Sequence, residues 1–314
     1  MNILLYHSQE NLELARAEAE SLIGKISRKD KFISIIKSEN CELLKRLALT
    51  KESCELLLVS EISELIEKVT EFDFKINNRY SVIARKGKEE REVFNAIWKS
   101  LKAKGHEPEI DLENPETQIM IYHAGKKAYV GKLINRNHEE FEKRRVHLRP
   151  APHPTSLHPK IARALVNLTG IKRGVLVDPF CGSGGFLIEA GLMGLKVKGY
   201  DISKELISKC EKNLKGYGVK DYSLEIKDAF TISEEWNYAI MDLPYGRNTP
   251  PVELEKMFPR ILRLLENDLK KKAVVGVPDS LDHEKFKTAL KLDGVYEDYV
   301  AKGLTRRFLV FSRE

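Results

Sequence analysis

The 314-residue sequence predicts an α/β fold in which a doubly wound, largely parallel sheet ends in an antiparallel hairpin and follows an α+β region. From Val175 onward, short apolar runs alternate with helical segments, which is typical of successive parallel βα units. The last two apolar runs are separated by only a short turn, and such a connection can join only antiparallel strands. Before residue 150 the strand and helix patterns do not alternate in this regular way.

The first 150 residues contain two predicted α+β units. The periodicity of apolar residues predicts strands over 2–6, 32–36, 55–59, 80–85, 118–123 and 127–133. It predicts helices over 11–23, 42–48 and 90–103, and glycines follow the first and last of them.

A proline-dense segment separates this region from the rest. Pro150, Pro152, Pro154 and Pro159 lie within ten residues, a density that interrupts regular structure and marks a linker. A helix over 160–169 follows it. We therefore expect four parts, with boundaries at 1–60, 61–147, 148–170 and 171–314.

The C-terminal part carries the alternating elements. The expected strands are 175–177, 196–200, 222–226, 238–241, 273–277, 295–300 and 308–311. The expected helices are 186–193, 204–217, 252–265 and 283–290.

A glycine loop follows the first of these strands, in the sequence Asp178-Pro-Phe-Cys-Gly-Ser-Gly-Gly185. Ligands of open α/β sheets bind at the carboxyl ends of the strands, and glycines let a ligand approach the backbone closely. The loop lacks the lysine of a phosphate-binding Walker loop, which disfavours a nucleoside triphosphatase. Its spacing is only loosely similar to GxGxxG, so nicotinamide dinucleotide binding remains an alternative.

Acidic residues end the first three strands of this part. Asp201 is placed to accept hydrogen bonds from both hydroxyls of a ribose, and Asp228, followed by Ala229, could meet an adenine amino group. Each acid alone could be a helix cap or a turn residue. Three of them at successive strand ends favour a nucleoside. S-adenosylmethionine fits, since it needs ribose and adenine partners but no pyrophosphate clamp.

The apolar run 238–241 ends in Asp242-Leu243-Pro244-Tyr245. An exocyclic amine of a base is a poor nucleophile, and acceptors beside it favour the tetrahedral nitrogen that attack requires. Asp242 can supply a carboxylate oxygen, Pro244 fixes a backbone carbonyl, and Tyr245 can stack on the base, worth roughly 1–3 kcal/mol. With the glycine loop, this tetrapeptide predicts methyl transfer to a base nitrogen; a base within a duplex would first be flipped out.

The composition sets further limits. The net charge of +6 permits nucleic-acid binding, with local clusters at 85–88, 143–149 and Arg306-Arg307, although each cluster could be a solvated face. The four cysteines form no CxxC pair, which makes a structural metal site unexpected. The absence of a long apolar run or a signal-peptide pattern predicts a cytoplasmic protein with no membrane association.

The glycine loop together with Asp242-Leu243-Pro244-Tyr245 resembles the amino-directed S-adenosylmethionine methyltransferases, whose catalytic domain is Rossmann-like. His153-Pro-Thr-Ser-Leu-His-Pro159 resembles a segment of the archaeal and eukaryotic tRNA (guanine-10-N2)-methyltransferases. That family has an N-terminal ferredoxin-like region and a THUMP RNA-binding domain. The resemblance implies these folds for residues 1–60 and 61–147.

The resemblance also implies residue roles, partners and a product. Asp242, Pro244 and Tyr245 would hold the guanine, with Leu243 at a position where the family more often has proline. The implied cofactor-binding residues are Thr155, Ser156, Asp178, Phe180, Cys181, Gly182, Gly184, Asp201, Ile202, Asp228, Ala229 and Asp242. The implied partners are tRNA and a small zinc-binding activator protein, and the product at position 10 carries one or two methyl groups.

Other functions remain open at this point. The same chemistry could act at tRNA position 6 or on ribosomal RNA. DNA amino-methylation shares the tetrapeptide, but the THUMP-like region favours RNA. A non-catalytic RNA-binding protein could retain the fold, although the intact Asp242 and glycine loop disfavour this. A THUMP-bearing sulfur-transfer enzyme is disfavoured because no nucleotide-cleaving loop is present.

Overall fold

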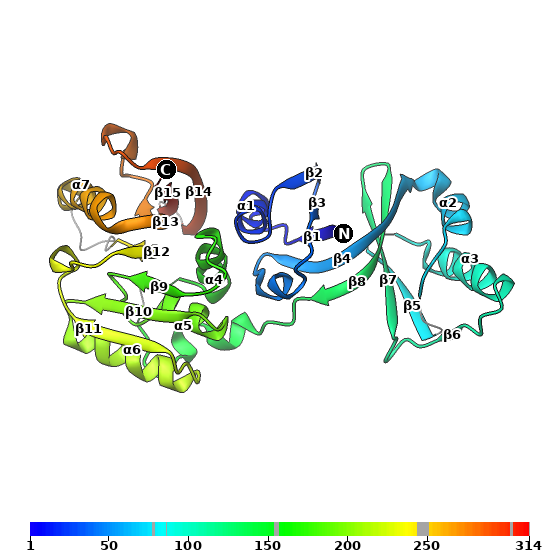
Figure 1. Cartoon of the computed structure of the whole chain (residues 1–314), viewed down its shortest axis with the longest axis horizontal. Coiled ribbons are helices and arrows are strands. Elements are labelled where there is room, and N and C mark those ends of the chain that lie inside the picture. The colour runs from blue at the N-terminus through cyan, green and yellow to red at the C-terminus, as the bar shows by residue number, and fades with distance from the viewer. Residues whose placement is uncertain (77–78, 86, 154–156, 244–250, 302–303, 314) are drawn as a thin grey trace. The chain divides into compact units, whose positions relative to one another are not determined.

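The computed structural model describes residues 1–76, 79–85, 87–153, 157–243, 251–301 and 304–313 (Figure 1). The chain divides into two compact units. The first comprises Met1–Leu12, Ile23–Lys45 and Thr50–His138, and the second comprises Glu13–Leu22, Arg46–Leu49 and Glu139–Glu314. The division into four domains stays a prediction.

The first unit contains one eight-stranded sheet in the order β2-β3-β1-β4-β8-β7-β5-β6. Its strands are β1 (Asn2–His7), β2 (Ile26–Asp30), β3 (Ile33–Lys37), β4 (Thr50–Glu61), β5 (Arg79–Arg85), β6 (Glu109–Ile110), β7 (Thr117–Ala124) and β8 (Lys127–Arg136). Its helices are α2 (Leu65–Glu71) and α3 (Glu90–Ala103). Strand β4 pairs with β1 and with β8, so both predicted α+β units contribute to one continuous sheet.

The second unit contains a seven-stranded sheet in the order β11-β10-β9-β12-β13-β15-β14. Its strands are β9 (Val175–Asp178), β10 (Lys196–Asp201), β11 (Tyr222–Ile226), β12 (Trp236–Asp242), β13 (Leu269–Pro278), β14 (Lys291–Ala301) and β15 (Leu304–Ser312). Its helices are α1 (Leu12–Leu22), α4 (Pro159–Leu168), α5 (Gly185–Leu192), α6 (Lys204–Gly216) and α7 (Pro251–Asp268).

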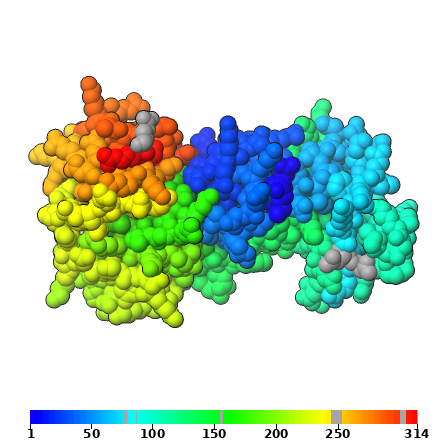
Figure 2. Space-filling model, in the orientation of Figure 1, coloured from blue at the N-terminus to red at the C-terminus, as the bar shows by residue number. Residues whose placement is uncertain are grey.

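The first five strands of this sheet are parallel, and β15 runs antiparallel between β13 and β14. On the face shown in Figure 2, the red C-terminal residues lie beside the orange residues that precede them in the chain. The predicted fold class, a doubly wound sheet with a C-terminal antiparallel hairpin, is therefore confirmed.

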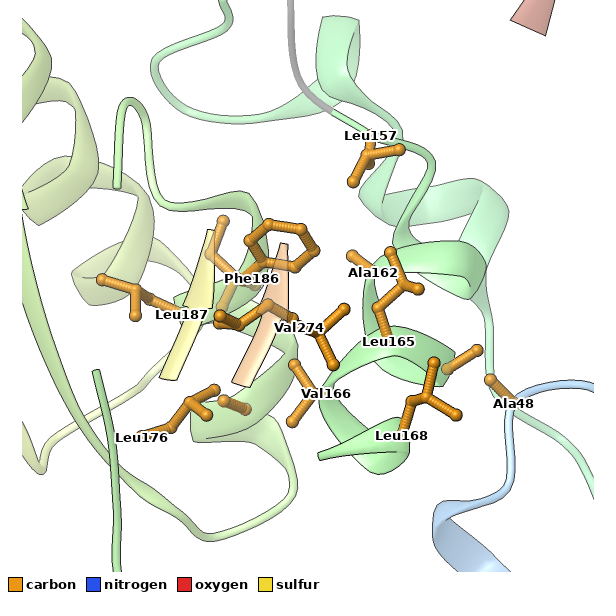
Figure 3. Packing of buried hydrophobic residues seen from close by; sticks show 14 of the residues in the cluster. Ala48, Leu157, Ala162, Leu165, Val166, Leu168, Leu176, Phe186, Leu187 and Val274 are labelled. Atoms are coloured by element: carbon orange, nitrogen blue, oxygen red, sulfur yellow. The ribbon is translucent and has the colours of Figure 1, made fainter. Parts of the chain in front are cut away.

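Alternate residues of each strand enter two separate cores, as the period of two in a strand requires. Ile240 and Val274 belong to the core that contains α4, α5 and α6, whereas Ala239 and Val275 belong to the core that contains α7. In Figure 3, Leu165 and Val166 of α4 lie toward Val274, and Leu168 lies toward Ala48. Helices thus cover both faces, which leaves the carboxyl edge of the parallel strands as the place for a ligand.

The predicted helix over 283–290 is wrong. Only a 3₁₀ turn, His283–Lys285, forms there. Glu266 of α7 binds the following residues, because its Oε1 accepts from Thr288 Oγ1 (2.6 Å) and from the Ala289 backbone N–H (2.8 Å). These bonds draw the segment along α7 and into β14 instead of into a further helical turn.

The predicted helix over 42–48 is also shorter than expected, and it is a 3₁₀ helix over Glu42–Arg46. The backbone N–H groups of Ala48 and Leu49 donate to the buried Glu18 carboxylate of α1 at 2.7 and 2.9 Å. Those donors are therefore engaged outside the helix. Strands β2 and β6 and helix α2 were not predicted.

No helix in the described part of the chain combines the length and apolar character needed to cross a membrane. Likewise, the described residues contain no group of three His, Cys, Asp or Glu side chains that could hold a metal ion.

Candidate functional site

The glycine loop joins β9 to α5 at the carboxyl edge of the sheet. Gly184 precedes α5 with φ of +88°, a conformation that side-chain-bearing residues rarely adopt. A Cβ atom there would also lie 2.7 Å from Cys210 Sγ of α6. Glycine at this position therefore permits both the turn and the close approach of two helices beneath the loop.

Asp201 ties this loop to the end of the next strand. Its Oδ2 accepts from the Gly182 backbone N–H (3.0 Å), and its Oδ1 accepts from the Ser203 N–H (2.8 Å). Ile202, between them, is 74% exposed, which presents an apolar side chain at the edge where a base could cover it. Asp201 therefore positions the loop, a role that the sequence did not indicate.

Asp178 ends β9 and is almost fully buried, at 2% exposure. It accepts from the Phe180 backbone N–H (3.1 Å). Burial raises the pKa of Asp178 well above its ordinary value, the hydrogen bond opposes this, and the charges of Asp201 and Asp242 add to the rise. Three carboxylates thus lie close enough to interact, and such a site favours a ligand that carries positive charge.

Asp228 begins a 3₁₀ turn, Ala229–Thr231, by accepting from the Phe230 N–H (3.0 Å). Ala229 is buried, and the rings of Phe230 and Phe180 meet edge to face with centroids 6.1 Å apart. The capping role considered from the sequence is therefore present at Asp228. Its contact with adenine stays a prediction.

Cys181 is a buried residue of the loop, and its thiol interacts with that of Cys210 on α6. That interaction and burial raise the pKa of the Cys181 thiol far above its ordinary value. A thiol in this state is not a nucleophile, because the thiolate is the reactive form. Cys181 therefore has a packing role in the loop.

Asp242 ends β12 and lies opposite Gly276 of β13. A Cβ atom on Gly276 would lie 2.4 Å from Asp242 Oδ1, so only glycine leaves room for this carboxylate. The Leu243 N–H donates to Gly276 O (3.0 Å), and the Leu243 side chain is buried. A proline could not make this bond, so leucine at this position adds a backbone contact that holds the strand end.

The predicted site residues Thr155, Ser156, Pro244 and Tyr245 lie outside the described residues. Their roles stay predictions.

Comparison with known proteins places this site in a family. A family model described as "RMKL-like, methyltransferase domain" matches residues 146–307, and one described as "DNA methylase" matches residues 28–212, ending before Asp242. A tRNA (guanine(10)-N2)-dimethyltransferase of Pyrococcus abyssi is 31% identical over 320 residues, with 96% of each chain covered. The chain belongs to the tRNA (guanine(10)-N2)-dimethyltransferase family.

A second member of this family, from Methanothermobacter thermautotrophicus, is 29% identical with all of both chains covered. Among solved structures, TrmN from Thermus thermophilus matches all of both chains with a TM-score of 0.53 and 18% identity. At that identity the structural likeness concerns the fold alone.

The sequence analysis did not identify two residues that lie near Asp242, Gly276 and Arg306. Gly276 carried a signal, because a glycine within a buried strand often marks a close approach. Arg306 of β15 was read only as part of a basic cluster with Arg307. Adjacent strand residues face opposite sides, so one of two neighbouring arginines had to point away from the other.

Proposed function

We propose that this family member transfers methyl groups from S-adenosylmethionine to the N2 amine of guanine 10 in tRNA, adding one or two. The observation that carries the proposal is the place of Asp242, fixed over Gly276 at the carboxyl edge and coupled electrostatically to the Asp178 carboxylate. Membership of the tRNA (guanine(10)-N2)-dimethyltransferase family supports guanine 10 of tRNA as the substrate. Methylation at tRNA position 6, or of ribosomal RNA, is the alternative.

The described residues fit S-adenosylmethionine. Its ammonium and sulfonium groups are positive, and three acidic residues gather where the glycine loop meets the sheet. The exposed Ile202 side chain offers an apolar surface to adenine. Bound there, the cofactor supplies an electrophilic methyl group on a cationic sulfur.

The chain contributes position and charge. As a C–N bond forms at guanine N2, the methyl–sulfur bond of the cofactor would break and the sulfur would leave as a neutral thioether. The nitrogen becomes tetrahedral and cationic until its proton passes to water. A carboxylate oxygen of Asp242 that accepts a hydrogen bond from its N–H stabilises this charge, and stabilisation that grows toward the transition state lowers the barrier. Fixing the two reactants in line removes further entropic cost.

The proposal includes five further parts, each of which needs its own experiment. The first unit would bind tRNA, as the THUMP resemblance implies, and Thr155 and Ser156 would approach the methionine end of the cofactor. Pro244 and Tyr245 would hold the guanine. A small zinc-binding activator would be a partner, and the protein would act in the cytoplasm.

Unmodified tRNA transcripts treated with the full-length protein and cofactor test the proposal directly. Nuclease digestion followed by mass spectrometry should find N2-methylguanine or N2,N2-dimethylguanine in the fragment with guanine 10. A transcript with adenine at position 10 should remain unmodified. Methylation confined to position 6, to ribosomal RNA or to DNA would contradict the proposed substrate.

Replacing Asp201 with alanine should weaken cofactor binding by roughly 10- to 100-fold, because losing a charged hydrogen-bond acceptor costs about 1.5–3 kcal/mol. The variant leaves the Gly182 and Ser203 N–H groups without this acceptor. Titration calorimetry with S-adenosylmethionine measures the change. The Asp201→Asn variant retains one acceptor oxygen, so its affinity should lie between those of the wild-type protein and the alanine variant. Unchanged affinity in a folded alanine variant would remove Asp201 from the site.

Replacing Asp178 with asparagine should stabilise the cofactor-free protein, and more so as pH rises above about 4. Because the pKa of this carboxyl is raised in the folded state, its contribution to stability is present at low pH and lost as pH rises. Asparagine keeps an acceptor for the Phe180 N–H but carries no charge. Thermal unfolding of both proteins across a pH series measures the difference. If the stabilities of the two proteins differed by the same amount at every pH, the pKa of Asp178 would not be raised in the folded state.

A further inference from the structure

Arg306 lies at the same edge of the sheet as the proposed site. Because β15 runs antiparallel to β13, the early residues of β15 lie beside the end of β13, and Arg306 pairs with Pro278. On its other side it pairs with Asp298 of β14. The Arg306 backbone is therefore held in the interior of the sheet, and the residue is 9% exposed.

The Arg306 side chain reaches Asp242. Its Nη2 lies 3.8 Å from Asp242 Oδ2, and neither side chain is more than 19% exposed. At this distance the contact is an ion pair rather than a hydrogen bond, so this guanidinium group orients the carboxylate by charge. Interactions between such partly buried charges are screened only weakly by solvent and salt.

Arg307 provides a contrast within the same strand. It forms an ion pair with Glu297 at 2.9 Å and donates to the Asp279 carbonyl oxygen at 3.2 Å. Arg306 and Arg307 thus point to different surroundings, because Arg306 pairs with Asp242 whereas Arg307 pairs with Glu297.

The charges around Asp242 make a nearby cation important. Asp178 of β9 lies close enough for the two carboxylates to interact, and Asp201 of β10 acts on Asp178 as well. Asp298 of β14 also faces Arg306; burial raises its pKa, while Arg306 and His158 oppose the rise. Carboxylates that share a site disfavour one another's ionised form, and a guanidinium group among them opposes this.

We propose that Arg306 is a positioning residue for methyl transfer, which holds the Asp242 carboxylate ionised and oriented to accept a hydrogen bond from the target amine. This role rests on the proposed function of Asp242. Arg306 acts through that carboxylate and need not touch the cofactor. Its loss should therefore reduce the chemical step without changing cofactor affinity.

The test compares Arg306→Gln and Arg306→Met with the wild-type protein, and uses Arg307→Gln as the matched control. Single-turnover methylation at saturating tRNA should be about 10- to 100-fold slower in either Arg306 variant, a loss of about 1.4–2.8 kcal/mol in transition-state stabilisation. Affinity for S-adenosylmethionine should stay within about twofold, and Arg306→Lys, which restores a positive charge, should recover part of the rate. Arg307→Gln should behave as wild type.

The pH dependence separates positioning from a merely structural role. Without the guanidinium charge, the neutral acid of Asp242 is favoured, so the acidic limb of the rate profile should move to higher pH in the Gln and Met variants. A wild-type rate and an unshifted acidic limb in either folded variant would overturn the inference. Methionine retains much of the apolar stem, so it serves if the glutamine variant does not fold.

The wild-type assay keeps this test distinct from that of the proposed function. Methylation of a different nucleotide by the wild-type protein would refute the assigned substrate. The same rate and pH comparison on that nucleotide would still decide the role of Arg306.

Discussion

Replacing Asp242 with asparagine should slow methyl transfer by on the order of 10²- to 10³-fold, the loss typical for removing one group that stabilises transition-state charge. Asparagine has nearly the same volume, so it should still fit over Gly276, where a Cβ atom would come within 2.4 Å of Asp242 Oδ1. The substitution removes the negative charge that would stabilise a cationic N2. Because that interaction strengthens only as the C–N bond forms, cofactor and tRNA binding should change far less than the rate of methyl transfer.

Single-turnover kinetics with labelled S-adenosylmethionine isolates the chemical step. Asp279→Asn is the matched control, because this exposed aspartate directly follows the neighbouring strand β13, three residues beyond the Gly276 that pairs with Asp242. It should methylate as fast as wild type. If Asp242→Asn did the same, Asp242 would be only the residue that ends β12.

The acids at the strand ends were predictable, since in a parallel sheet apolar runs followed by Asp place their carboxylates at one edge. The role of Asp201 in positioning the glycine loop was not predictable. Its hydrogen bonds with Gly182 and Ser203 depend on the three-dimensional course of the loop. The proximity of Gly276 and Arg306 to Asp242 could be known only from the register of the paired strands. Asp242 meets Gly276 only because β12 and β13 pair in one particular alignment, and Arg306 joins them only because β15 inserts beside β13.

The basic cluster at 143–149 shows a second limit of the sequence. It permitted nucleic-acid binding or a solvated face, yet Arg144 pairs with the buried Glu189 at 2.8 Å and Arg149 is itself buried. Arg145 pairs with Glu142 at 2.6 Å. Charge counts along the chain cannot reveal such partners, because Glu189 is distant in sequence.

Helix α1 gives a related example. Glu18 lies on its buried face and accepts from Ala48, Leu49 and the Asn167 side chain, whose Nδ2 is 2.8 Å from Oε1. Burial raises the pKa of Glu18, while these hydrogen bonds oppose the rise. Residues 13–22 and 46–49 therefore belong to the second unit, and an experiment on cofactor binding should retain them.

Replacing Glu189 with alanine should destabilise the second unit by up to about 3–5 kcal/mol, because it leaves the buried Arg144 and Arg163 side chains with only one carboxylate, that of the partly exposed Glu139. Glu189 of α5 is 1% exposed and binds Arg144 and Arg163 at 2.8 and 2.9 Å. Both guanidinium groups also lie over the Phe141 ring, at 5.1 and 5.2 Å from its centre. The carboxylate therefore holds together α5, α4 and the segment that leads into the proline-dense linker.

Calorimetry should show the second-unit transition roughly 10 °C lower, since about 1 kcal/mol corresponds to 2–4 °C in a unit of this size. Glu211→Ala is the control: it removes the exposed α6 pair with Lys215, and such pairs contribute roughly 0.3–0.5 kcal/mol. A Glu189 variant no less stable than this control would mean that Glu139 alone is enough to compensate both guanidinium groups. A large loss would show that this buried ion-pair cluster fixes residues 139–149 to α4 and α5 of the second unit.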